Sequence, residues 1–136
     1  MATLTVLGIA QDGGRPQPGC QRPCCQDLLA VDYRSPVSLG IKTKNGTTIL
    51  IEATRDLGRQ LITFGEPSID HLFLTHAHLG HVDGLGLFGR ETMSARGIPL
   101  HISQSMQNLI KSTPAWALLL EQGVFELTKI GYVEID

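Results

Sequence analysis

The segment 75–84 reads THAHLGHVDG and directly follows the apolar run IDHLFL. It holds three of the five histidines of the chain. Alternate residues at the end of a strand point to the same side, so His76 and His78 can present imidazoles to one metal ion while His81 approaches from the start of a helix. Imidazole nitrogens suit zinc better than iron or manganese. The spacing therefore predicts a metal site; the alternative is a set of histidines bonded to solvent or to carbonyl groups.

Strand-like and helix-like runs alternate around this segment. Asn45-Gly46 between two β-branched runs is typical of a β-hairpin. The pattern as a whole predicts an α/β domain. We expect strands at 3–10, 37–42, 47–53, 69–75, 98–102 and 124–127, and helices at 54–64, 85–93, 103–111 and 116–121.

Composition narrows the class of protein. The chain has 136 residues, of which 42% are hydrophobic and 18% charged, as expected of one globular domain at 1–136. A net charge of -2 with scattered Lys and Arg argues against nucleic-acid binding. No apolar run approaches the roughly 20 residues of a membrane span, and the first residues lack the layout of a signal peptide. We therefore expect a cytoplasmic protein that acts on a small molecule and binds neither nucleic acid nor membrane.

The long segment after the first predicted strand contains every cysteine of the chain, at Cys20, Cys24 and Cys25. An odd number of crowded cysteines does not suit a disulfide framework, so these thiols indicate either a metal site or free thiols. The segment begins with QDGG at 11–14, which we interpret as a turn. A turn at that end of a strand can line the rim of an active site.

The histidine segment resembles the signature T-H-x-H-x-D-H-x-x-G of the metallo-β-lactamase superfamily. GIAQDGG at 8–14, the cysteines at 20–25 and LFGRE at 87–91 resemble the branch that contains the pyrroloquinoline-quinone biosynthesis protein B. The resemblance covers nearly the whole chain. It implies an α/β (α+β) fold with a mixed, mostly antiparallel sheet and flanking helices, of which residues 1–136 would be the N-terminal half of an αβ/βα sandwich.

The resemblance also implies roles for the histidines. His76 and His78 match ligands of a first metal ion and His81 matches a ligand of a second, so the cofactor would be one or two zinc ions, with iron or manganese as alternatives. Gly80 stands where the family has an aspartate, which puts the second ion in question. Asp83 is a candidate to replace that aspartate, and the alternative is that it caps the following helix.

The resemblance also implies roles for Glu52 and for the cysteines. Glu52 stands where the family has an aspartate beside the metal site, which would hold the ligand loop by hydrogen bonds; the alternative is an exposed strand carboxylate. Relatives of this branch carry a structural zinc on cysteines in the same loop, which points to Cys20 with at least one of Cys24 and Cys25. Adjacent Cys24 and Cys25 would both bind only in a strained loop.

The implied activity is that of a metal-dependent hydrolase, in which a metal-activated water attacks a phosphodiester, an ester or a lactam. The alternative is a non-catalytic protein that handles a metal or a cofactor, as in the quinone-biosynthesis branch. Since the remaining ligands of the family lie in the second half of the sandwich, we expect the isolated chain to be inactive. We also expect it to form a homo-oligomer or to associate with a complementary C-terminal half.

Overall fold

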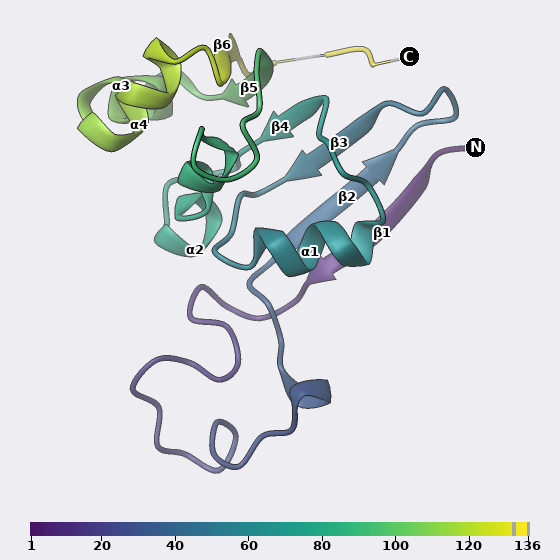
Figure 1. Ribbon diagram of the computed structural model, residues 1–136, viewed down its shortest axis with the longest axis vertical. Helices are drawn as coiled ribbons and strands as arrows, with labels where there is room; N and C mark the ends of the chain where they lie inside the picture. Colours follow the sequence, from purple (N-terminus) through teal and green to yellow (C-terminus); the bar gives the residue numbers. More distant parts are fainter. Residues whose placement is uncertain (132, 136) are drawn as a thin grey trace.

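A computed structural model describes residues 1–131 and 133–135. Its centre is one six-stranded sheet in which the strands lie side by side in chain order (Figure 1). The first three strands pair antiparallel and the last four pair parallel, so the sheet is mixed rather than mostly antiparallel. The α/β class is confirmed. The strands are β1 (Thr3–Gly8), β2 (Ser38–Lys42), β3 (Thr48–Ile51), β4 (His71–Phe73), β5 (Ile98–Ile102) and β6 (Phe125–Lys129).

The predicted hairpin is present between β2 and β3. Gly46 has φ +93°, a left-handed conformation that glycine adopts without a steric penalty. The backbone N–H of Thr43 donates to the carbonyl of Thr47 at 2.9 Å and closes the turn. The Asn-Gly signal therefore fixes which residues of β2 and β3 face one another, such as Lys42 and Thr48.

The helices follow the sequence pattern except after the histidines. We expected a helix at 85–93, but helical turns instead occupy 79–82 and 85–88, and the chain then leaves the helix. Four glycines between 80 and 89 explain the difference, because each lowers the local helix propensity. The helices are α1 (Leu57–Phe64), α2 (Leu79–Val82), α3 (Gln104–Ser112) and α4 (Pro114–Glu121), with 3₁₀ turns η1 (Ala30–Asp32) and η2 (Leu85–Phe88).

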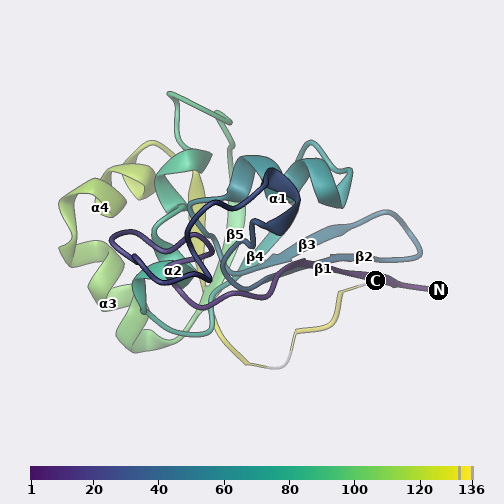
Figure 2. The same cartoon turned by 90° about the horizontal axis from the view of Figure 1, so that it is seen from below.

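The core lies between the sheet and the helices, and it includes residues of α1, α2, η2, α3 and α4. Leu50, Leu72 and Leu100 are paired directly across β3, β4 and β5 and are fully buried. Each contributes about 1.5–3 kcal/mol to stability. The ring of Phe64 on α1 packs against Gly40 of β2, where a Cβ would lie 2.7 Å from it. Figure 2 shows α1 on this side of the sheet, with α3 and α4 packed together beyond it.

The opposite face of the sheet is less covered. Its directly paired row runs through Val6, Leu39, Ile51 and Phe73. Val6 is 54% exposed and the neighbouring Leu4 58% exposed. An apolar row of this kind is where another protein layer would pack.

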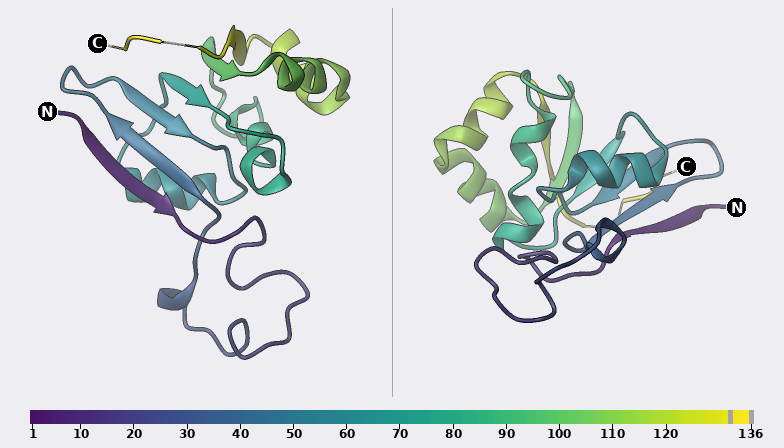
Figure 3. Two further views of the ribbon diagram at one scale, coloured as in Figure 1. Left: turned by 180° about the vertical axis from the view of Figure 1, so that it is seen from behind. Right: turned by 60° about the horizontal axis from the view of Figure 1, so that its bottom comes forward.

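The segment 9–37, between β1 and β2, extends beyond the end of the sheet (Figures 1 and 3). Isolated bridges join Ala10 to Pro36 and Arg15 to Arg34 at its base. The Arg55 guanidinium donates to the backbone carbonyl of Asp12 at 2.8 Å. These contacts hold the start of the segment beside the histidines. Within residues 1–131 and 133–135, no helix is long and apolar enough to cross a membrane.

Candidate metal centre

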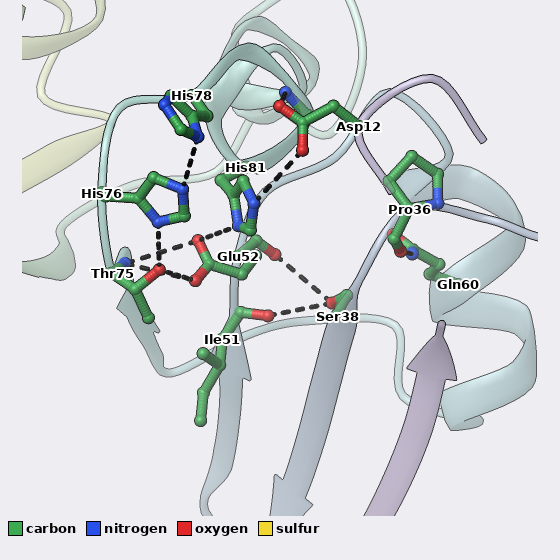
Figure 4. A network of polar contacts seen from close by, with 11 residues as sticks. Asp12, Pro36, Ser38, Ile51, Glu52, Gln60, Thr75, His76, His78 and His81 are labelled. Carbon is green, nitrogen blue, oxygen red and sulfur yellow. Dashed lines mark hydrogen bonds and ion pairs between the residues drawn. The ribbon is translucent and has the colours of Figure 1, made fainter. Parts of the chain in front are cut away.

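The histidines lie where parallel strands end. β4 finishes at Phe73, and the chain then enters the loop that carries His76 and His78 before α2 carries His81. We call these three residues the histidine cluster. The ring centroid of His76 lies 4.0 Å from that of His81 and 4.6 Å from that of His78. Figure 4 shows the three imidazoles converging, which is the arrangement that the spacing predicts.

A buried carboxylate lies beneath the histidine cluster. Glu52 directly follows β3, the neighbour of β4, and is only 2% exposed. Its backbone has φ +72°, a left-handed conformation that costs a non-glycine residue about 1–2 kcal/mol. Such a conformation persists only where the surrounding structure imposes it, and it is common at functional sites. Here it turns the carboxylate toward the loop that follows β4.

Glu52 contacts that loop at Thr75. The backbone N–H of Thr75 donates to the carboxylate at 3.3 Å, and the Thr75 hydroxyl donates to the same group. Since the hydroxyl proton is used in this way, its oxygen can only accept from His76 Nδ1, which lies 2.8 Å away. Nε2 of His76 is then the nitrogen with a free lone pair, and it faces His78 Nδ1 at 3.0 Å. This series of hydrogen bonds places the proton of the His76 ring on Nδ1 and leaves Nε2 free to bind a metal ion.

His81 lies between two carboxylates. Its Nδ1 is 3.4 Å from Glu52 Oε2, and its Nε2 is 3.4 Å from Asp12 Oδ1. Nδ1 is buried and makes no hydrogen bond within the described part of the chain. Asp12 was not predicted as a site residue, because it is 68 positions from Gly80 and no local spacing connects them. The QDGG turn was the one signal that placed it near the rim.

Asp12 also contacts the turn that carries His81. The backbone N–H of Gly80 donates to Asp12 Oδ2 at 3.2 Å. This hydrogen bond lowers the pKa of Asp12, desolvation opposes it, and the nearby His81 and His78 lower the pKa further. Asp12 is therefore an anion at the mouth of the histidine cluster.

The donor set fits a transition metal. Glu52, His76 and His81 each offer an atom within 4.8 Å of the others, whereas His78 lies outside this group and contacts only His76 among the three. Imidazoles with a carboxylate are typical of zinc sites. Asp83 lies apart from this set, because its carboxylate pairs with the Arg55 Nε at 3.0 Å. The ligand roles of His76, His78, His81 and Asp83 stay predictions, as does the loop-holding role of Glu52.

A second group forms in the segment 9–37. Cys20, Cys24 and Cys25, which we call the cysteine cluster, are free thiols whose sulfurs all lie within 4.8 Å of one another. The adjacent Cys24 and Cys25 have their sulfurs 3.9 Å apart. We expected Cys20 to lie close to at least one of this adjacent pair, and the loop brings both close to Cys20. A structural metal at these thiols remains a prediction.

A family model for the metallo-beta-lactamase superfamily matches residues 36–132. The chain belongs to this superfamily. It is 38% identical over 80 residues to an octanoyltransferase of Porphyromonas gingivalis (strain ATCC BAA-308 / W83), a match that covers 59% of this chain and 16% of that protein.

Two solved structures of the superfamily fold match nearly the whole chain. A diphosphatase from the PhnP family is 28% identical, with a TM-score of 0.73 over 99% of this chain and 52% of the diphosphatase. Zinc-bound PqqB from Methylobacterium extorquens is 20% identical, with a TM-score of 0.80 over 98% of this chain and 50% of PqqB. The expected resemblance to PqqB is confirmed at the level of the fold. The chain spans about half the length of these two proteins.

Proposed function

We propose that this chain carries the metal-binding half of a metal-dependent hydrolase, in which zinc is held by His76, His78 and His81. The observation that supports the proposal most strongly is the convergence of the three imidazoles above the buried Glu52 carboxylate. A polar cluster at the carboxyl ends of parallel strands is also where α/β proteins commonly bind ligands. Hydrolase-like chemistry is in keeping with a similar solved protein that is described as a diphosphatase.

In this proposal the histidines bind the metal ion, and Glu52 and Thr75 orient the histidine rings. Glu52 fixes Thr75, and the Thr75 hydroxyl holds His76 with Nε2 directed into the cluster. Glu52 also faces Nδ1 of His81, which leaves Nε2 of that ring directed outward. When bound, a zinc ion would lower the pKa of a water and polarise the substrate oxygen. The ring orientations are set before any ion arrives, which favours tight binding.

The rim of the centre combines one cation, Arg55, with the carboxylate of Asp12. A cavity of about 620 Å³ is lined by His78, Arg55 and residues 11–13, 17 and 18, which include Asp12. The guanidinium of Arg55 is partly exposed there. Because Arg55 already pairs with Asp83 and donates to the Asp12 carbonyl, this rim does not distinguish the phosphodiester from the ester or the lactam.

The test combines metal content with hydrolysis. Protein purified without chelator or nickel resin is expected to contain zinc, and His76→Ala to lose it from the histidine cluster. His71→Ala is the matched control, because His71 lies on β4 and contacts His101 rather than the cluster. Hydrolysis of bis(p-nitrophenyl) phosphate and p-nitrophenyl acetate should be measured on the same samples. A chain that binds no zinc even when zinc is added would overturn the proposal.

The cysteine cluster would hold a separate, structural zinc. Three thiolates within 4.8 Å of one another supply three of the four donors that such a site requires. The expected readout is slower alkylation of the thiols in the presence of zinc than in the presence of chelator. Equal alkylation rates in both conditions would identify them as free thiols.

A second candidate function is a non-catalytic protein that handles a metal or a cofactor. The absence of a side chain at Gly80, where the family has an aspartate, favours this candidate. The two candidates differ in one result. A zinc-loaded chain joined to its complementary half that hydrolyses neither test substrate would favour metal or cofactor handling.

We propose that a complementary half of the fold covers the face of the sheet that exposes Val6 and Leu4. The support is that the chain aligns with about half of each of two solved proteins, and that this face is apolar. A second copy of this chain is the other outcome, through a twofold interface. Light scattering during size-exclusion chromatography separates them. A stable monomer of 14.8 kDa that unfolds independently of concentration would contradict both.

A further inference from the structure

We propose that Asp12 is a metal-binding residue of the histidine cluster. Asp12 lies in the segment that follows β1, and its side chain occupies the space left by Gly80. The inference rests on the proposed metal function of the histidine cluster. It assigns a carboxylate to that centre which no spacing in the sequence indicates.

The first step is steric. A Cβ built on Gly80 would lie 2.4 Å from the Cα of Asp12, 2.7 Å from its Cβ and 2.8 Å from its Cγ. These separations are far below van der Waals contact, so any side chain at position 80 would displace Asp12. Glycine at 80 and aspartate at 12 are therefore two parts of one arrangement, in which the side chain of Asp12 occupies the space beside the α2 turn.

The second step concerns what the Asp12 carboxylate faces. Its Oδ1 lies 3.4 Å from His81 Nε2, the nitrogen on the opposite side of the ring from Glu52. The Asp12 side chain is 44% exposed and lines the same cavity as His78. An ion in that cavity could therefore bind the Asp12 carboxylate and His81 Nε2 together. The buried Glu52 is left to orient the ring from the other side, which is the usual arrangement of a carboxylate behind a metal-bound histidine.

The third step separates metal binding from simple anchoring of the loop. Asp12 Oδ2 accepts from the backbone N–H of Gly80, and a carboxylate there would stabilise the α2 turn even without an ion. The backbone of Asp12 is held independently, because its carbonyl accepts from Arg55. An asparagine at position 12 keeps an acceptor for Gly80 but loses the anionic ligand. Asp12→Asn therefore removes the anionic metal ligand and keeps the acceptor for the Gly80 N–H.

The experiment titrates the full chain and Asp12→Asn with Co²⁺, followed by displacement with Zn²⁺. Cobalt absorbs in the visible at either cluster, and a thiolate ligand adds a strong near-ultraviolet band. The titration is therefore repeated with Cys20, Cys24 and Cys25 replaced by serine, so that the visible band then reports the histidine cluster alone. Asp12→Asn is expected to weaken binding at the histidine cluster by about 10–100-fold and to change the visible spectrum. The control is Asp27→Asn, which removes the same charge from an exposed position of the same segment.

A second variant tests the steric step without touching a carboxylate. Gly80→Ala should push Asp12 away and weaken cobalt binding in the same range, whereas Gly86→Ala should not, because a Cβ at Gly86 meets nothing within 4 Å. If the unmodified chain gives no visible cobalt band, the proposed metal centre fails and this inference fails with it. If the chain binds cobalt and Asp12→Asn has the same affinity and spectrum, this inference alone is wrong and Asp12 only anchors the α2 turn. Circular dichroism confirms that each variant is folded.

Discussion

The histidine cluster and the cysteine cluster both gather three metal-binding side chains, but different structures hold them in place. The histidine cluster is anchored to strand ends, and its loop is tied to β3 by the hydrogen bond from Ala53 N–H to the carbonyl of His81 at 2.9 Å. The cysteine cluster lies in the segment 9–37, where Cys24 is exposed. There the Arg15 guanidinium donates to the Cys24 carbonyl at 2.7 Å, and the Gln26 amide donates to the Cys20 carbonyl at 2.9 Å.

The two clusters therefore differ in whether their donors are oriented before a metal ion binds. The fold itself orders the histidine cluster, so a metal there would find its donors already oriented. The thiols are ordered by a few exposed contacts, so a metal there would have to fix the loop as it binds, and its binding energy would appear as stability of that loop. Variants of the scaffold should therefore disturb the first cluster strongly, and variants of the ligands should disturb the second mainly when zinc is present.

The largest expected effect comes from Glu52→Ala. It leaves the partly buried hydrogen bonds of the Thr75 N–H and hydroxyl without their acceptor and removes a buried side chain, which should lower the free energy of unfolding by about 2–4 kcal/mol. Chemical denaturation in chelator measures it. The matched control is Glu66→Ala, which removes a surface ion pair with Lys42 that is worth about 0–1 kcal/mol. An equal effect of the two substitutions would contradict the scaffold role of Glu52.

A smaller effect is expected from Gly84→Ala. A Cβ at Gly84 would lie 1.9 Å from the carbonyl oxygen of Thr54, at the point where the histidine loop packs against the end of β3. Relief of this overlap should cost about 1–3 kcal/mol. Gly86→Ala, two residues away, has open space and is the control. If thermal unfolding shows no difference between the two variants, the loop is not held by this close approach.

These elements also show what could be read from the sequence. The strands, the β2–β3 hairpin and the convergence of the histidines follow from local patterns, because periodicity, Asn-Gly and the spacing of His76, His78 and His81 act over a few residues. The family resemblance added Glu52 as a residue beside the metal site. Its burial and its contacts with Thr75 and His81 are seen only in the structure.

What the sequence could not indicate depends on contacts between distant segments. Asp12 and Gly80 meet only because the end of β1 and the α2 turn lie at the same edge of the sheet, and no local rule relates them. The helix expected at 85–93 was too long, because the glycines that allow the close approach at Gly84 also interrupt helix formation. The pairing of Asp83 with Arg55 likewise needed the structure.

Replacing all three cysteines by serine should have a still smaller effect in chelator. The thiols lie in an exposed loop outside the core, so the free energy of unfolding should change by no more than about 0.5 kcal/mol. Added zinc should stabilise the unmodified chain more than the triple variant, by up to about 2.7 kcal/mol at a hundredfold excess over the dissociation constant. Differential scanning fluorimetry with and without zinc measures both. Equal stabilisation of the two chains would place all zinc binding outside the cysteine cluster.

The last prediction separates the histidine cluster from a histidine pair elsewhere in the sheet. His101 on β5 is 2% exposed, stacks on Phe73 with ring centroids 4.1 Å apart and contacts His71 Nδ1 at 3.0 Å. Burial lowers the pKa of His101 below its ordinary value of 6.5, and the neighbouring His71 lowers it further. Between the lowered pKa and 6.5, the unfolded chain binds more protons than the folded chain at this residue.

The contribution of His101 to stability is therefore complete above pH 6.5 and is lost as the pH falls toward the lowered pKa. Urea unfolding in chelator between about pH 5 and pH 8 should show it as a slope that His101→Phe removes. His71→Phe is the control and should keep most of the slope, because burial is the larger cause of the shift. If His101→Phe leaves the slope unchanged, the pH dependence does not come from His101 and this prediction is wrong.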